Sequence, residues 1–279
     1  MPQNLSGTLF DDIFTAIKDN KLLLPIQPEV AIEMQQLSEK PDMTVNDLKK
    51  VLGKDPALTA RIIRLANSPL ARGLVPINSL DTAINRLGFR FVNYVALGLA
   101  MRQLFVATHK IIEEKMKAVW LHCSEVSAAS YVLAAHTKLF PPEEALVAGL
   151  LHEIGILPIL TFAESYPALR DDALEIECLI QNHSQNLGKV ILSAWHFPEQ
   201  IINVIENMNN VNRIIDKPDL ADIVLIAKIH VVQGTNHALA KIDKENIPAY
   251  ARLGMDRKKD FYAQPHLQVA LQSTQQAFA

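Results

Sequence analysis

The sequence has few of the features that mark secreted, membrane or nucleic-acid-binding proteins. Its 279 residues include two cysteines, Cys123 and Cys178, which are far apart and outside any CxxC spacing. A disulfide framework or a thiolate zinc site is therefore not expected. Apolar runs such as Tyr94–Met101 (YVALGLAM) are shorter than the roughly 18 residues that a membrane-spanning helix needs. A net charge of -3 gives no general attraction to nucleic acid or to an anionic membrane.

The first residues, MPQNLSGTLFDD, contain neither a basic leader nor an apolar core. We therefore expect no secretory signal, no membrane segment and a cytoplasmic location. The chain is 49% hydrophobic, which is enough to bury a substantial core.

Apolar residues recur at helical spacing along almost the whole chain, and alternating strand patterns joined by hairpin turns are not found. The pattern predicts an all-α, multi-helical fold. We expect helices over residues 8–19, 28–38, 44–53, 56–67, 79–88, 90–106, 111–138, 143–160, 171–182, 186–194, 198–208 and 219–234, and a helical C-terminus. Asp55 followed by Pro56 is typical of an N-cap and a first helical position. The polar stretch Thr108–Lys117 predicts a boundary between two packed helical subdomains, residues 1–107 and 108–279.

Several motifs carry a resemblance to a known family. The first half contains LLPIQPEVAIEM, DPALTARIIRLANSP and INSLDTAINRLGFRFVNYVALG, and the second contains AGLLHEIGIL followed by HSQNLGKVILSAWHFPEQIINVI. Together they resemble the HDOD family, the HD-related output domain of bacterial signalling proteins, over roughly residues 20 to 235. The resemblance implies an HD-like helical fold, a relationship to the HD superfamily of metal-dependent phosphohydrolases, and a regulatory output module that has lost catalysis.

The resemblance also implies where a metal site would lie. Active HD phosphohydrolases hold divalent ions with a histidine, an adjacent His-Asp pair and a later aspartate. His122 matches the first histidine and His152 the paired one, while Glu153 stands in place of the paired aspartate. His183 matches a further histidine of the two-metal enzymes. A working site would hold iron, manganese, nickel or zinc; otherwise we expect no cofactor.

Two departures from the HD pattern count against a working site. Lys228 occupies the position of the last aspartate, and its ammonium repels a cation. Met208 and Asn209 stand where the two-metal enzymes have a histidine pair. Asp222 is the obvious substitute carboxylate, but it lies six residues before Lys228 and so about 240° around the helix.

Lys228 also stands out without the family comparison. Its helical neighbours three and four positions away are apolar: Val224, Leu225, Val231 and Val232. Lysine is rarely buried unless it is paired. We hypothesise that Lys228 reaches Glu153 and that its ammonium takes the place of the metal, leaving a structural pair. His122 and His152 also have the apolar neighbours of ordinary hydrogen-bonded core histidines.

These observations favour a bacterial signal-transduction output module that contacts signalling or sensory proteins and does not turn over a substrate. Its expected interaction surface consists of Arg61, Arg64 and Asn67 and of the apolar groove where the two subdomains meet. The alternative is a metal-dependent phosphohydrolase acting on a phosphomonoester or nucleotide, with His122, His152 and Glu153 as ligands. The sequence indicates no oligomeric state.

A helix-turn-helix over residues 44–72 would make the protein a DNA-binding regulator. Six basic residues stand against two acidic ones in this stretch: Lys49, Lys50, Lys54, Arg61, Arg64 and Arg72 against Asp47 and Asp55. However, Asp55 would place a negative charge at the start of the recognition helix, where phosphates approach. Nucleic acid is therefore the least favoured partner.

Overall fold

The computed structural model describes residues 28–38, 40, 42–67, 75–257 and 261–278. The helix expected over residues 8–19 and the side chain of Arg72 lie outside them. All regular secondary structure in these described residues is helical, without a strand. The prediction of an all-α fold is therefore confirmed.

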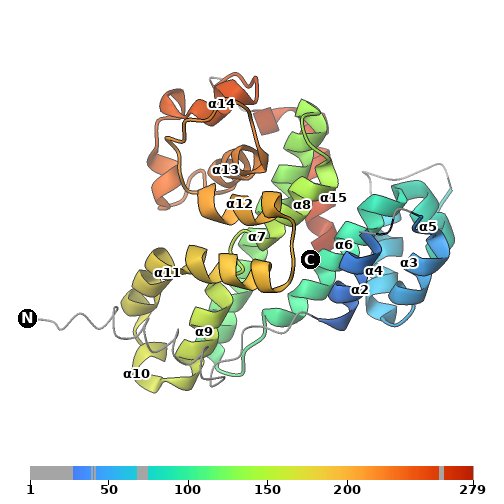
Figure 1. Ribbon diagram of the computed structural model, residues 1–279, viewed down its shortest axis with the longest axis horizontal. Coiled ribbons are helices and arrows are strands. Elements are labelled where there is room, and N and C mark those ends of the chain that lie inside the picture. The colour runs from blue at the N-terminus through green and yellow to red at the C-terminus, as the bar shows by residue number, and fades with distance from the viewer. Residues whose placement is uncertain (1–27, 39, 41, 68–74, 258–260, 279) are drawn as a thin grey trace, which may run out of the picture.

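The N-terminal group of helices contains the DPALTARIIRLANSP motif. Its described elements are α2 (Glu29–Ser38), α3 (Val45–Leu52), α4 (Pro56–Ala66), α5 (Leu80–Leu87), α6 (Phe89–Met101) and the 3₁₀ helix η1 (Arg102–Leu104). Asp55 caps α4, because its carboxylate accepts a hydrogen bond from the Leu58 amide at 3.0 Å. Figure 1 shows α2 to α5 gathered on one side of the molecule, with α6 leading from them to the remaining helices.

The rest of the chain surrounds the 28-residue helix α7 (Lys110–Thr137). The α-helices that follow are α8 (Pro142–Leu151), α9 (Ile156–Ser165), α10 (Pro167–Arg170), α11 (Ala173–Ala194), α12 (Glu199–Asn207), α13 (Leu220–Val231), α14 (Pro248–Arg252) and α15 (Pro265–Phe278). Three short 3₁₀ helices, η2 (Ala238–Lys241), η3 (Lys244–Asn246) and η4 (Phe261–Ala263), join the last of them. The boundary expected near residue 108 falls between η1 and α7, and it stays a prediction.

Three of the predicted helices have the wrong extent. The helix expected over residues 143–160 is broken at residues 152–155, between α8 and α9, because the chain turns where Gly155 meets α11. A Cβ atom on Gly155 would lie 1.9 Å from the Ser184 carbonyl oxygen and 2.4 Å from the Gly188 nitrogen. The helices expected over residues 171–182 and 186–194 form one helix, α11, which buries apolar residues before the polar HSQN stretch (Ile176, Leu179) and after it (Leu187, Ile191).

The segment Pro142–Ser165 has the length and the apolar composition of a membrane-crossing helix, but 89% of its most apolar window is buried inside the protein. It corresponds to α8 and α9, which are core helices. Most of α8 is buried because it packs on α7.

The contact between α7 and α8 is made by small side chains. A Cβ atom on Gly149 would lie 2.7 Å from the Ser127 Cα atom, so the two backbones approach closely at this point. The Ser127 hydroxyl donates a hydrogen bond to the Leu146 carbonyl at 2.7 Å. This close approach brings the middle of α7 against the C-terminal end of α8, where the GLLHEIG motif lies.

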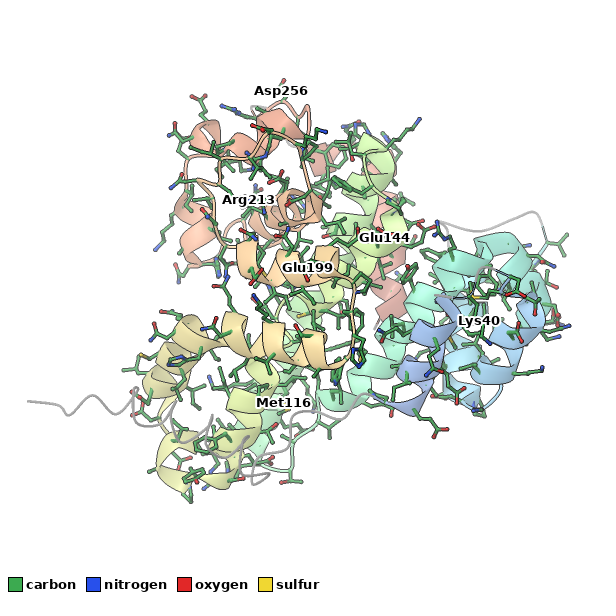
Figure 2. All side chains as sticks on the ribbon, in the orientation of Figure 1. Lys40, Met116, Glu144, Glu199, Arg213 and Asp256 are labelled. Carbon is green, nitrogen blue, oxygen red and sulfur yellow. The ribbon has the colours of Figure 1, made fainter. Side chains whose placement is uncertain are left out.

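Polar contacts join the N-terminal group of helices to the rest. The Gln35 amide on α2 donates hydrogen bonds to the Trp195 and His196 carbonyls at 2.9 and 3.1 Å. Beside this contact, and within the rest of the chain, Gln200 on α12 donates to Glu144 on α8 at 2.9 Å. Figure 2 shows Glu144 and Glu199 near this junction, with side chains filling the space between the helices.

Candidate metal centre

Three potential metal ligands come together at the end of α8. His122 is on α7, His152 follows the last residue of α8, and Glu153 is in the turn before α9. Their ligand atoms all lie within 4.8 Å of one another. The Glu153 Oε1 atom is 3.7 Å from His122 Nε2 and 3.6 Å from His152 Nε2.

The imidazole of His152 is held in one tautomer. Its Nδ1 atom lies 2.7 Å from the Gly149 carbonyl, and because a carbonyl only accepts, Nδ1 carries the proton and donates it. Burial lowers the pKa of His152 to about 3, although the charge of Glu153 opposes this shift. The ring is therefore neutral, and its buried Nε2 atom has no hydrogen-bond partner in the described part of the chain. A bare imidazole nitrogen of this kind is what a metal ligand requires.

The other two side chains reach the protein surface. The exposed fraction is 23% for the His122 side chain and 17% for the Glu153 side chain. Burial lowers the pKa of His122, although Glu153 again opposes the shift. Both imidazoles are therefore neutral near pH 7, whereas the carboxylate between them is charged.

A cation from the protein itself occupies this cluster. The Lys228 Nζ atom on α13 lies 2.8 Å from Glu153 Oε1 and 3.2 Å from Asn209 Oδ1, and the Lys228 side chain is only 3% exposed. Burial by itself would raise the pKa of Glu153, but the charge and hydrogen bond of Lys228, together with the two neighbouring histidines, outweigh it and hold that pKa well below its usual range. The pair is therefore ionic at neutral pH.

The residues present do not fit a divalent metal while Lys228 keeps this position. The oxygen that faces both histidines, Glu153 Oε1, is the one that accepts from the ammonium. A metal would have to displace that ammonium, and a divalent ion beside a retained lysine would be repelled at short range. The three ligand groups would match the protein ligands of a catalytic zinc site, which water completes, so it is the lysine and not the number of ligands that opposes a metal.

His183 lies apart from this cluster. It is on α11, whose neighbouring residue Ser184 contacts Gly155. Among the described residues, the group of ligand atoms that could share an ion contains His122, His152 and Glu153 and does not include His183.

Two residues at the site were not assigned a role from the sequence. Asn209 supplies the second acceptor for the Lys228 ammonium; the missing histidine pair drew attention to this position but did not indicate its contact. His237, in the segment after α13, interacts electrostatically with the site: burial and then the charge of Lys228 lower the pKa of His237. No sequence pattern marks His237, which follows α13 in an irregular segment.

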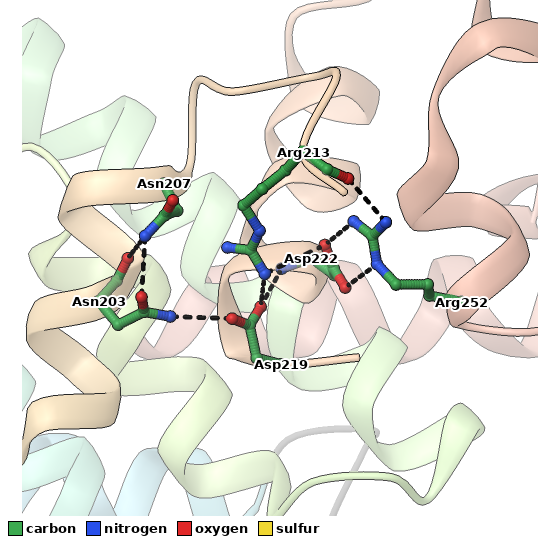
Figure 3. A network of polar contacts seen from close by, with 6 residues as sticks. All are labelled: Asn203, Asn207, Arg213, Asp219, Asp222 and Arg252. Carbon is green, nitrogen blue, oxygen red and sulfur yellow. Dashed lines mark hydrogen bonds and ion pairs between the residues drawn. The ribbon is translucent and has the colours of Figure 1, made fainter. Parts of the chain in front are cut away.

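Asp222 is not part of the histidine cluster and belongs to a separate network of polar contacts (Figure 3). Its two oxygens accept from Arg252 on α14 at 2.6 and 2.8 Å. Arg213 lies 3.6 Å from Asp222 and also pairs with Asp219, the N-cap of α13. Asn203 on α12 donates to Asp219 at 2.9 Å. The network ties α12, α13 and α14 together and leaves no carboxylate of Asp222 for a metal.

The three residues of the expected interaction surface lie in different environments. Arg61 is partly buried and lines a groove beside α7 and α15, whereas Arg64 is exposed and does not line it. The Asn67 amide donates to the Ile77 carbonyl at 2.7 Å and to the Ile63 carbonyl at 3.1 Å, and its oxygen accepts from the Ile77 amide at 3.0 Å. Asn67 therefore holds the segment after α4 in place.

The basic stretch around α3 and α4 is partly neutralised. Lys49 pairs with Asp81 at 2.7 Å, and Lys54 pairs with Glu33. Helix α15 also packs against α4, the helix that would have to enter a DNA groove. These contacts leave fewer charges for phosphate than the composition of the stretch implies.

The fold and the site define a class of protein, an all-helical HD-like domain whose metal-ligand cluster contains a lysine. The HDOD domain family matches residues 24–211, and the chain belongs to this family.

Three known proteins are similar to the chain. One is an uncharacterized protein of Treponema pallidum (strain Nichols), 24% identical over 230 residues; these cover 75% of this chain but only 42% of the relative, so the chain spans less than half of that protein. A candidate metal-dependent phosphohydrolase from Shewanella amazonensis SB2B has a similar structure, with a TM-score of 0.85, 25% identity and coverage of 99% of this chain and 100% of the other. An HDOD domain protein from Geobacter sulfurreducens, at 20% identity and a TM-score of 0.68 over 90% of this chain and 92% of the other, shares the fold.

Proposed function

We propose that this chain is a regulatory module of bacterial signal transduction, located in the cytoplasm, which acts through contacts with signalling or sensory proteins and does not hydrolyse phosphoesters. The observation that carries the proposal is the 2.8 Å contact between the Lys228 ammonium and Glu153, inside the cluster where an HD enzyme would bind its metal. Membership of the HDOD family supports the same function.

The chemistry of the cluster supports a non-catalytic role. Hydrolysis by an HD enzyme depends on a metal that activates water and polarises the phosphoryl oxygen. The Lys228 and Glu153 pair satisfies its own charges, and the neutral His152 ring is buried away from any substrate. Neither the pair nor the histidines supply an activated nucleophile.

Hydrolysis of a phosphomonoester or nucleotide is the second candidate, and one observation favours it. The buried His152 Nε2 atom has no hydrogen-bond partner in the described residues, and it lies within 4.8 Å of the other two ligand atoms. If Lys228 left Glu153, the three groups would become available together to iron, manganese, nickel or zinc.

Elemental analysis tests the proposal. The untagged protein is purified without chelator, next to His152→Ala as a control that removes a ligand and Lys228→Asp as a variant that completes the HD pattern. Hydrolysis of p-nitrophenyl phosphate and bis(p-nitrophenyl) phosphate is assayed with each divalent ion added.

We expect the wild type to contain no more metal than His152→Ala and to hydrolyse neither ester, whereas Lys228→Asp retains added metal. Near-stoichiometric metal in the wild type that is lost in His152→Ala, together with hydrolysis, would establish the phosphohydrolase instead.

A further inference from the structure

A groove of about 800 Å³ lies beside α7, between α4 and α15, and shares no residue with the histidine cluster. Its floor is apolar and buried, and it consists of Leu58, Leu99, Phe105 and Trp120. Two large apolar side chains on its walls are exposed, Val106 at 69% and Leu121 at 59%. Exposed apolar side chains that gather around an apolar hollow are typical of an interaction site.

The groove is long and follows a helix axis. Helix α7 lines it with residues at successive intervals of four positions, Glu113, Lys117, Leu121 and Glu125. At about 1.5 Å per residue these positions extend along about 18 Å, or about three helical turns. The other walls are also helical, with Ala57 and Arg61 from α4 and a glutamine face of α15. A further helix lying along the groove would pack against three helices, α4, α7 and α15, as each helix of a bundle packs against its neighbours.

One positive charge in the groove, that of Arg61, has no directly paired counter-ion among the described residues. Arg61 makes neither a hydrogen bond nor an ion pair within the described part of the chain. Its pKa is lowered by burial and then by the positive charges of Arg102, which also lines the groove, and Arg64, and the negative charge of Asp55 opposes this shift only in part. A partly buried guanidinium beside another one is stabilised by an anion from outside.

The acidic residues of the groove do not supply that anion. Glu113 is paired with Lys117 at 2.6 Å, and Asp55 is used to cap α4. Burial raises the pKa of Glu125, and no positive charge acts to lower it. Asp55 acts on the charge of Arg61 but does not pair with it, so a carboxylate in direct contact with Arg61 would come with the occupant.

We propose that this groove binds an amphipathic helix of a partner protein, about three turns long, whose apolar face covers Leu121, Val106 and the buried floor and whose carboxylate pairs with Arg61. Apolar anchors at i, i+3 or i+4 and i+7 match a groove of this length. The inference rests on the proposed function, because it specifies the surface and the partner chemistry through which a regulatory module acts. The proposed binding surface does not include Arg64 or Asn67, because neither residue lines the groove.

Photo-crosslinking tests the proposal. A benzophenone amino acid replaces Leu121 in the full chain, in cells that produce the protein naturally, and the crosslinked partner segments are sequenced by mass spectrometry. The same probe at Leu174, which is 85% exposed, and at Ile214, which is 91% exposed, reports on two surfaces outside the groove. Arg61→Glu and Arg64→Glu are each combined with the Leu121 probe as matched charge reversals on one helix.

We expect the Leu121 probe to capture helical segments with an apolar stripe and an acidic residue. Arg61→Glu should lower the yield at least tenfold, whereas Arg64→Glu should leave it unchanged. Melting temperatures of the purified variants confirm that both remain folded.

The possible failures separate the two proposals. Crosslinks from Leu174 or Ile214 but not from Leu121 would overturn the groove as the site and leave a function through protein contact intact. If the captured segments contain no acidic residue, or if both charge reversals give equal yields, the occupant is not a helix whose carboxylate pairs with Arg61. Crosslinks from none of the three positions would count against protein contact itself.

Discussion

Replacing Lys228 with methionine should destabilise the protein by about 3 kcal/mol at pH 7, because it leaves the charge of Glu153 buried without a partner. Methionine has nearly the length of lysine and suits the apolar stripe of α13, so the change removes the charge more than the packing. The Glu153 side chain is 17% exposed, so water does little to screen it.

The magnitude follows from the contact itself. Two unit charges 2.8 Å apart attract by about 6 kcal/mol at an effective dielectric constant of about 20, before the desolvation of either group is subtracted. Desolvation cancels most of that attraction in a buried pair, so the intact pair contributes little net stability. A single substitution forfeits the attraction and keeps the desolvation of the remaining charge. The double variant Lys228→Met with Glu153→Gln removes both charges and should lie within about 1 kcal/mol of the wild type.

The pH dependence has a definite sign. In the wild type the pKa of Glu153 is lowered from its ordinary 4.5, so its contribution to stability is present above about pH 4.5 and is lost as the pH falls further. In Lys228→Met, burial without the lysine raises that pKa, so lowering the pH toward 4.5 protonates the carboxyl and relieves the strain. The difference in unfolding free energy between the two proteins should therefore be largest at pH 7 and shrink toward pH 4.

Urea unfolding followed by circular dichroism at pH 7, 5.5 and 4 measures these differences. His152, whose pKa burial and, to a smaller extent, Lys228 lower to about 3, destabilises both proteins as the pH falls below its unfolded value. It does so less in Lys228→Met, which further narrows the difference between the two proteins at low pH. A Lys228→Met variant as stable as the wild type at pH 7, or a double variant no better than the single one, would refute the pairing.

Three further predictions concern packing, a loop and a thiol. Gly155→Ala should cost at least about 3 kcal/mol in urea unfolding, since a Cβ atom would lie 1.9 Å from a backbone atom of α11. Gly188→Ala should cost about 1 kcal/mol, because its Cβ atom would lie 3.2 Å from Ile205 side-chain carbons and 3.4 Å from the Gly155 nitrogen, which is ordinary contact. Equal costs would contradict the close approach. Asn67→Ala should destabilise the protein by about 2 kcal/mol through its lost hydrogen bonds. It should leave crosslinking from Leu121 unchanged. Reduced crosslinking in a folded variant would mean that Asn67 is part of the interaction surface. Burial raises the pKa of the buried Cys123 thiol well above its ordinary value, so iodoacetamide should modify Cys178 in the native protein and Cys123 only after unfolding; rapid native labelling in Cys178→Ser would disprove this.

Local signals account for the parts of the fold that were predicted well. Helical periodicity depends on residues three and four positions apart, and caps such as Asp55 act within one turn, so both can be read from neighbours in the chain. The same reasoning failed at residues 152–155 and at the HSQN stretch of α11. In both places a contact between distant segments, the meeting of Gly155 with Ser184 and Gly188, decides where a helix ends or continues.

By itself, the sequence determined the all-α class, the family and the residue types of the degenerate cluster, because these depend on pattern and residue identity. The apolar neighbours of Lys228 also indicated that its ammonium needs an anion. The sequence suggested Glu153, which is 75 positions away, as that anion, but only the tertiary structure shows that the ammonium also donates to the neutral Asn209 amide oxygen. The groove likewise exists because α15 packs beside α4 and α7. Contacts of this range depend on how whole helices pack, which no local pattern specifies.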